Sequence, residues 1–378
     1  MRHNAMKLSL TEHFSVIKDP RQQSKVDHEL VDILILCITA VICGAEGWQD
    51  IESFGHSRLE WLKQFGNFKN GIPVDDTIAR VVSSLNPKAL QKCFIDWMQN
   101  ASEVTEGKII SLDGKTVRRS FDKRSKKSAI HMVSAFASEN GVVLGQQKTT
   151  DKSNEITAIP ELLQLLELKG CIVTIDAMGC QKKVAKKIIE KKADYVLAVK
   201  DNQKKLHSDI KDFFKICHEE NFKNVSHNYF EETHKGHGRI EVRRYWITDC
   251  LLCIDAKEDW TGLTSIGMAE SERHIDGKVS LEQRYFIVSI KPDAQQFAHA
   301  VRSHWAIENK LHWVLDVTFR EDESRVRRNN SAENFGVFRH IALNALRQEK
   351  SYKRGIKAKR FKATLESSYA EKVIQGVF

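Results

Sequence analysis

The spacing of apolar residues changes at about residue 105, and this change limits the folds open to the 378-residue chain. Before it, apolar residues recur with helical spacing, which predicts helices over residues 28–43, 48–65, 77–85 and 87–98. After Lys108, short apolar runs typical of buried strands alternate with helical segments. We therefore expect a helical unit over residues 1–105 and an α/β unit over residues 106–378.

The second unit has the element order of a mixed sheet. Its predicted strands are 109–112, 131–138, 142–148, 172–176 and 195–199, with helices at about 154–168, 181–192 and 203–217. A hairpin around Gly141 followed by strand–helix alternation predicts helices on both faces of the sheet. Residues 228–292 are strand-like again and are expected to form a β-rich insertion. A further helix is predicted to start at Asp293, with Gln296 completing a capping-box-like start.

Three acidic residues occupy positions that are usually apolar. Asp113 and Asp176 each end an apolar run, and Glu308 falls on the apolar stripe predicted for the helix after Asp293. Carboxylates are rare at such positions unless they are paired or bind metal. If the first and fourth strands are parallel neighbours, both aspartates emerge at one edge of the sheet. Three converging carboxylates could hold divalent metal for phosphoryl transfer.

Each acid also has a structural explanation. Asp113 and Asp176 are ordinary residues at the start of a turn. Glu308 could be a single buried glutamate paired with Arg302 or His304.

The order of these elements resembles the ribonuclease H-like fold of DDE transposases and retroviral integrases. Local strings resemble those of the H-repeat-associated family of bacterial insertion-sequence transposases, and the resemblance covers essentially the whole chain. The matching strings are Leu112–Lys115, Lys152–Ile156, Thr174–Ala177, Val199–Gln203, His304–Asn309 and Leu315–Val317.

The resemblance implies a ribonuclease H-like mixed sheet flanked by helices, with the β-rich insertion and an N-terminal helical domain. It makes Asp113, Asp176 and Glu308 a catalytic triad that binds Mg²⁺, with Mn²⁺ as a substitute. The implied activity is cleavage of double-stranded DNA at the ends of an element and transfer to target DNA, by a homodimer or larger synaptic complex. A catalytically silent DNA-binding regulator and a structure-specific nuclease are the alternatives.

The chain departs from the wider family around Glu308. A Tyr, Arg, Glu, Lys signature is expected there, but Val301, His304 and Leu315 stand at the Tyr, Arg and Lys positions. The phosphate contacts of that signature therefore need other residues, for which the candidates are Arg302, Asn309, Lys310 and His312.

A net charge of +9 makes polyanions the first partner class to consider. Seven basic residues lie within residues 115–127, where Lys115, Arg118 and Arg119 could hold phosphates or belong to a solvated loop. Arg239 and Arg243 share a strand face, as DNA contacts or as parts of a salt-bridged strand. The remaining residues expected to contact DNA are Lys200, Asn202, Gln203, Arg302, His304 and Asn309.

Other sequence features indicate where in the cell the protein is found and argue against the use of ATP. Residues 1–13 lack a signal-peptide core, the apolar run 33–43 is too short to span a bilayer, and eight scattered cysteines suit a reducing compartment. We expect a cytoplasmic, nucleoid-associated protein. No phosphate-loop motif supports use of ATP. The basic C-terminal tail, about residues 350–378, is expected to be solvated or to contact DNA.

Overall fold

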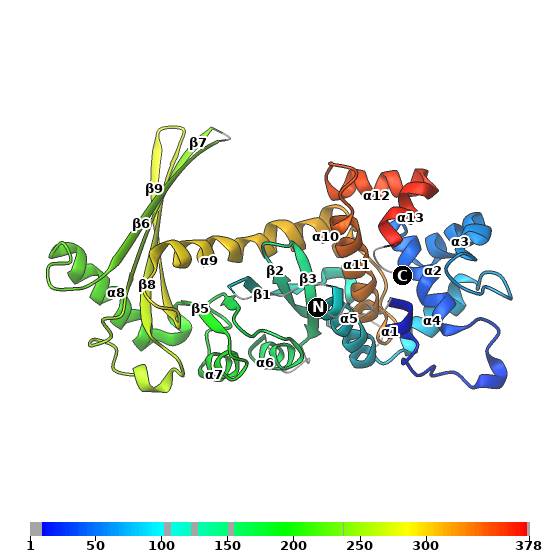
Figure 1. Ribbon diagram of the computed structural model, residues 1–378, viewed down its shortest axis with the longest axis horizontal. Coiled ribbons are helices and arrows are strands. Elements are labelled where there is room, and N and C mark those ends of the chain that lie inside the picture. The colour runs from blue at the N-terminus through cyan, green and yellow to red at the C-terminus, as the bar shows by residue number, and fades with distance from the viewer. Residues whose placement is uncertain (1–9, 102–106, 122–127, 150–154, 237, 376–378) are drawn as a thin grey trace, which may run out of the picture.

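The structure, a computed structural model, describes residues 10–101, 107–121, 128–149, 155–236 and 238–375. The molecule is elongated, with a long β ribbon at one end and a bundle of helices at the other (Figure 1). None of the described helices is long and apolar enough to cross a membrane.

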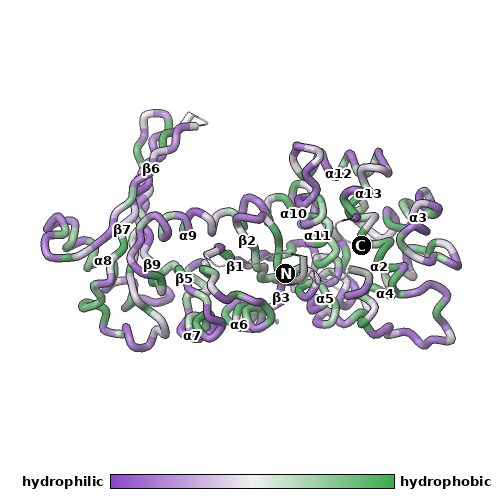
Figure 2. The backbone as a smooth tube through the Cα atoms, viewed as in Figure 1, coloured by the Kyte–Doolittle hydropathy of each residue, from purple (hydrophilic) through white to green (hydrophobic). Residues whose placement is uncertain are grey.

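The N-terminal region is helical, as predicted. Its helices are α1 (Leu10–Phe14), α2 (Leu30–Ile42), α3 (Trp48–Leu62), α4 (Asp75–Ser84) and α5 (Pro87–Ala101). Helix α2 is buried along nearly its whole length and, apart from Asp32 and Thr39, is made of hydrophobic residues (Figure 2). Such a helix must be covered on all sides by other elements.

The C-terminal helices provide much of that cover. Helix α11 (Ser331–Gln348) packs against α2, α4 and α5, and α12 (Ile356–Leu365) and α13 (Ser367–Ile374) lie beside it. One continuous apolar core therefore runs from α1 through the sheet to α13. The change from helices to strands near residue 105 does not divide this core.

The strands form one nine-stranded mixed sheet in the order β3-β2-β1-β4-β5-β9-β8-β7-β6. Strand β1 pairs antiparallel with β2 and parallel with β4, which confirms that the first and fourth strands are parallel neighbours. The bounds are β1 Ile109–Thr116, β2 His131–Ala137, β3 Val142–Lys148, β4 Ile172–Ile175, β5 Asp194–Val199, β6 Asn228–Gly236, β7 Arg239–Thr248, β8 Ser265–Ile275 and β9 Lys278–Val288.

The β-rich insertion extends this sheet and does not form a second one. Its last strand, β9, pairs with β5 through residues 285–288, and the distal halves of β6–β9 continue outward as the ribbon. Strands β8 and β9 are longer than predicted. The distal half of β8 carries polar residues on both faces and so lacks the alternation by which a half-buried strand is recognised. In the distal half of β9, Val279 and Leu281 alternate with polar residues but are exposed.

Helices cover both faces of the sheet. Helices α6 (Glu155–Leu165), α7 (Lys182–Glu190) and α8 (Lys204–Glu219) pack on one face. Helix α9 (Ala294–Ala306) crosses the other face, where Phe297 enters a smaller apolar core with Val288 (Figure 1). The carboxylate of its N-cap, Asp293, accepts a hydrogen bond of 3.0 Å from the backbone N–H of Gln296, as expected.

The basic segment near the C-terminus is only partly solvated: Lys350, Lys353, Arg354 and Lys357 are exposed, but two of its basic residues are not. Lys359 and Arg360 lie in α12 and are buried. The Arg360 guanidinium donates hydrogen bonds to the carbonyl oxygens of Val41 (3.1 Å), Ala45 (2.9 Å) and Thr318 (2.6 Å). These contacts tie α12 to α2 and to the end of the helix that follows α9, so part of the positive charge serves the fold.

Candidate active site

Asp113 and Asp176 lie side by side at one edge of the sheet. The last parallel pair between β1 and β4 is Leu112 with Ile175, and each aspartate is the next residue of its chain segment. Neighbouring strands are about 4.8 Å apart. The two side chains therefore leave the sheet next to each other, on the side that α9 covers.

The two backbones then diverge. Strand β4 ends, and the Asp176 carboxylate accepts hydrogen bonds from the N–H groups of Met178 (3.1 Å) and Gly179 (3.2 Å) in the following loop. Strand β1 continues to Thr116 because β2 still pairs with it. Asp113 is therefore inside a strand and not at its end, and its Oδ1 accepts the Gly114 N–H at 2.9 Å.

The electrostatics of this edge are unfavourable to two ionised carboxylates. Burial, followed by the negative charge of Asp176, raises the pKa of Asp113 to about 7. Burial also raises the pKa of Asp176, and the charge of Glu155 adds to this effect. Backbone N–H groups oppose both shifts without cancelling them. The edge therefore concentrates negative charge.

His312 touches Asp113 without supplying a compensating charge. Its Nδ1 lies 3.4 Å from Asp113 Oδ2. Burial and the nearby charge of Lys115 lower the pKa of His312 to about 4, so the ring is neutral at pH 7.

Glu308 lies in a π-helical turn, η5 (Ile307–His312), between α9 and α10 (Trp313–Val317). The i→i+5 hydrogen bonds of this turn add one residue to it, which changes the residues that face the sheet after it. Ile307 and Leu311 consequently take the buried positions, and Glu308 is exposed. Its predicted place on the buried stripe was wrong. Glu308 instead lines the same pocket as Asp176.

This pocket, of about 170 Å³, lies between the sheet edge and the α9–η5 helix. Lys200, Arg284 and Trp305 also line it. His304 lines it too, but its Nδ1 is hydrogen-bonded to Thr174 Oγ1 at 3.2 Å. Burial lowers the pKa of His304 to about 4. This neutral ring fastens α9 to β4 at the signature position where an arginine was expected.

Two amides after β5 brace the loop that carries Asp176. Asn202 Nδ2 donates to the Ala177 carbonyl at 2.6 Å, and Gln203 Nε2 donates to the Cys180 carbonyl at 3.1 Å. Lys200, two residues before Asn202, is exposed. Of these three residues predicted to bind DNA, Lys200 presents its charge to the pocket and the two amides hold the loop.

The three basic residues after Asp113 differ in their surroundings. Lys115 is largely buried, its ammonium contacts the carboxylate of Asp316, and it lies 2.7 Å from Glu321 Oε2. Arg118 is 81% exposed and pairs with Asp322 at 3.2 Å. Arg119 is also exposed. The structure thus leaves Arg118 and Arg119 accessible and places Lys115 within a network of ion pairs.

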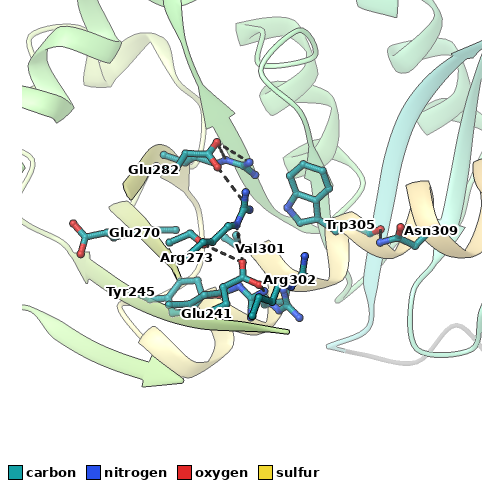
Figure 3. Close-up of a pocket in the computed structure, with 14 residues that line it drawn as sticks. Glu241, Tyr245, Glu270, Arg273, Glu282, Val301, Arg302, Trp305 and Asn309 are labelled. Carbon is teal, nitrogen blue, oxygen red and sulfur yellow. Dashed lines mark hydrogen bonds and ion pairs between the residues drawn. The ribbon is translucent and has the colours of Figure 1, made fainter. Parts of the chain in front are cut away.

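A second pocket, of about 190 Å³, lies between the ribbon and α9 (Figure 3). We call it the arginine pocket, because Arg239, Arg243, Arg273, Arg284 and Arg302 line it. The buried carboxylate of Glu241 pairs there with Arg243 at 2.5 Å and with Arg273 at 3.1 Å. Arg243 is therefore part of a salt-bridged strand. Arg239 also lies 4.0 Å from Glu241, but its side chain is about half exposed. Arg284 and Trp305 line both pockets, which are contiguous.

Two further residues predicted to bind DNA project from the α9–η5 helix beside the arginine pocket. Arg302 is 41% exposed and lies 3.4 Å from Glu232. Asn309 is exposed, and its amide donates to the Trp305 carbonyl at 3.3 Å. Figure 3 shows Arg302, Trp305 and Asn309 along the same helix.

Glu155, the first residue of α6, was not among the residues expected at the site. It is buried, and its charge contributes to the raised pKa values of both Asp113 and Asp176. The signal available in the sequence was its place in the string Lys152–Ile156, together with the glycine that follows Asp113.

The side chains at this edge suit a hard divalent cation. Carboxylate oxygens are the preferred ligands of Mg²⁺, and a bound cation would favour the ionised forms of Asp113 and Asp176, which burial disfavours. In the described part of the chain, however, no three His, Cys, Asp or Glu side chains converge closely enough to hold one ion together. Glu308 is exposed and lines the same pocket as Asp176 without joining such a group.

Known proteins resemble the chain over nearly its full length. It is 54% identical over 371 residues to "Putative transposase YncI" of Escherichia coli O157:H7, covering 97% of this chain and 94% of that protein. It is 46% identical over 372 residues to "H repeat-associated putative transposase YhhI" of Escherichia coli strain K12, covering 97% and 98%. A piggyBac transposase synaptic complex with hairpin DNA aligns with a TM-score of 0.44 and 11% identity, over 97% of this chain and 78% of that one.

Family models agree with the relatives. The model described as "Transposase DDE domain" matches residues 67–345, and the "DDE_Tnp_1-associated" model matches residues 11–98. Domains of this family generally use divalent metal ions. The match covers more than half of the chain, so the resemblance stated from the sequence is confirmed: the chain belongs to the DDE transposase family, with H-repeat-associated transposases among its relatives.

Proposed function

We propose that the chain is a metal-dependent transposase that cleaves DNA at the ends of its element and joins the freed 3′-hydroxyl to target DNA. One observation supports this most: Asp113 and Asp176 follow the last paired residues of adjacent parallel strands, with Glu308 across the same pocket. Each of two adjacent carboxyl groups makes ionisation of the other less favourable, so a cation that neutralises both charges can bind between them.

In this proposal Asp113, Asp176 and Glu308 hold Mg²⁺, for which Mn²⁺ can substitute. Bound divalent ions would activate the attacking oxygen and neutralise charge on the phosphate. The exposed position of Glu308 leaves its carboxylate able to turn toward Asp176. Around the acids, Lys200 and Arg284 lie where phosphate oxygens would enter the pocket.

The proposed DNA path continues from the pocket into the arginine pocket. Arg239, Arg302 and Asn309 are accessible along it, and Arg118 and Arg119 are accessible after β1. Such residues position a duplex through its phosphates without reading its sequence. The helical N-terminal region is proposed to recognise the element ends. Bringing two ends together calls for at least two copies of the chain.

The test uses labelled double-stranded DNA that carries the ends flanking the gene of this chain, incubated with purified protein in Mg²⁺ or in EDTA. The expected result is nicking at the element boundary in Mg²⁺ alone, followed by joining to a plasmid. Asp176→Asn should abolish both steps. Asp259→Asn is the matched control, because Asp259 is 54% exposed and pairs at the surface with Lys182.

Each remaining outcome identifies an alternative. Cleavage by the Asp176→Asn protein would overturn the assignment of the acids. Binding without cleavage in Mg²⁺ or Mn²⁺ would indicate a silent regulator, and cleavage without joining would indicate a nuclease.

A further inference from the structure

The outer half of the ribbon projects from the body of the molecule, and its two faces differ in character (Figure 1). On the face turned toward α9, Glu241, Arg273 and Glu282 line the arginine pocket. Successive side chains of a strand point to opposite faces of a sheet. The residues next to these three along their strands therefore point away from α9, on a surface that we call the outer face.

The outer face carries apolar side chains in two adjacent rungs across β7, β8 and β9. The strand pairing forms one rung from Ile240, His274 and Val279 and the next from Val242, Glu272 and Leu281. Ile240 is 41% exposed, Val279 61% and Leu281 59%. Each rung thus has an apolar residue at both ends and a polar residue in the middle.

The fold of a single chain does not account for these apolar residues. Among the residues that the structure describes, none of the four belongs to either apolar core. A preference for strands explains the β-branched residues at exposed positions, but leucine is not among the residues enriched in strands. Single exposed apolar residues are ordinary, whereas several together on one surface mark a site of interaction.

The two rungs are complementary to each other, so the outer face is complementary to itself. A two-fold axis running across the strands between the rungs would place each rung on the other rung of a second copy. Ile240 of one copy would then meet Val242 of the other, and Val279 would meet Leu281. Between them, the imidazole of His274 would meet the carboxylate of Glu272, a contact that the two residues already make within one chain at 2.7 Å.

We propose that the outer face binds the outer face of a second copy of this chain, so that the ribbons of two copies pack face to face. The inference rests on the proposed function in one respect, because holding two element ends calls for two copies. The patch is much smaller than a standard interface, which has about 20–30 residues on each side. The pairing is therefore weak in solution and is strengthened when DNA brings two copies together.

Sedimentation velocity of the full chain over a series of protein concentrations tests this proposal, with and without element-end DNA and in EDTA to prevent cleavage. The wild type should associate, and more tightly with DNA. Val279→Lys places an ammonium group against Leu281 of the other copy, and Leu281→Glu places a carboxylate against its Val279. Each variant should raise the Kd of the dimer at least about tenfold, because an unpaired charge is costly within an apolar contact.

Mixing the two variants tests the arrangement itself. In an equal mixture of Val279→Lys and Leu281→Glu proteins, the introduced ammonium group meets the introduced carboxylate, and the unchanged Leu281 meets the unchanged Val279. The mixture should therefore associate where neither protein does alone.

Ile275→Lys is the matched control, since Ile275 is 44% exposed on the same ribbon but pairs with Arg239 on the face turned toward α9. Its association without DNA should equal that of the wild type. Thermal unfolding of all three variants should match the wild type, because the changed side chains are exposed.

The outcomes separate this inference from the proposed function. A wild type that stays monomeric at every concentration, with and without DNA, would overturn the inference. A dimer that neither Val279→Lys nor Leu281→Glu weakens would also overturn it, since the copies would then meet elsewhere, and the proposed function would stand. A mixture that fails to associate would rule out the two-fold arrangement. Failure of the proposed function has a different sign, the absence of metal-dependent nicking by the wild type.

Discussion

Asp113 and Lys115 lie two positions apart on β1, and each belongs to a group of charged residues. In one group like charges meet, and in the other opposite charges are paired. The acidic edge contains Asp113 with its carboxylate neighbours. The second group, which we call the Lys115 network, comprises Lys115, Asp316, Glu321, Asp322 and Arg339. The side chains of Asp113 and Lys115 are similarly buried, at 16% and 12% exposed. The difference between the two groups is therefore one of partners and not of depth.

The pKa values express this difference. Despite burial, Lys115 and Arg339 lower the pKa of Glu321 to about 2. Burial together with Asp176 raises the pKa of Asp113 to about 7. The Lys115 network is thus charge-compensated and joins β1 to residues more than 200 positions later. At the acidic edge Lys200 offsets the charge of Asp176 only in part, and the pKa values of Asp113 and Asp176 stay raised. A cation site needs such incompletely compensated charge, although it destabilises the fold.

The largest effect is expected from breaking the Lys115 network. Lys115→Ala leaves Glu321 buried beside Arg339 and exposes Asp316 to like charges. Removing one partner of a buried ion pair costs about 3–5 kcal/mol. Urea unfolding should show a loss of that order in the free energy of unfolding. A loss below about 1 kcal/mol would mean that Lys115 is not a structural residue and would restore its predicted role at phosphates.

A smaller effect of opposite sign is expected at the acidic edge. Asp113→Asn removes a charge that burial and Asp176 disfavour, so the free energy of unfolding at pH 8 should rise by about 1–2 kcal/mol. DNA cleavage should be lost in the same protein. A destabilised Asp113→Asn protein would contradict the view that this edge is uncompensated.

The stabilisation by Asp113→Asn should depend on pH. Because the folded-state pKa of Asp113 is raised to about 7, its protonated form stabilises the fold at low pH, and this stability is lost as pH rises through 7. The difference between variant and wild type should shrink by about 1 kcal/mol between pH 8 and pH 5. Comparing the two proteins is necessary, because the lowered pKa values of the buried His304 and His312 act in the opposite direction. If the difference in the free energy of unfolding does not change with pH, a group other than Asp113 titrates in this range.

The same contrast shows what the sequence could predict. Apolar runs followed by Asp113 and Asp176 indicated a shared sheet edge, because adjacent parallel strands need little more than local pattern to be recognised. The place of Glu308 was missed, since helical spacing assumes regular turns and the π turn depends on how Ile307 and Leu311 pack. The charged residues close to Lys115 in the sequence likewise gave no indication of its partners, because these come from a distant segment of the chain.

The smallest effect on stability should come from Arg118, three residues beyond Lys115 and 81% exposed. Its pair with Asp322 is at the surface, so Arg118→Ala should change the free energy of unfolding by less than about 0.5 kcal/mol. If Arg118 contacts a phosphate, the variant should still bind element DNA more weakly. The slope of log affinity against log salt should then fall by about one. An unchanged salt slope would remove Arg118 from the proposed DNA path, while leaving the contrast between the acidic edge and the Lys115 network intact.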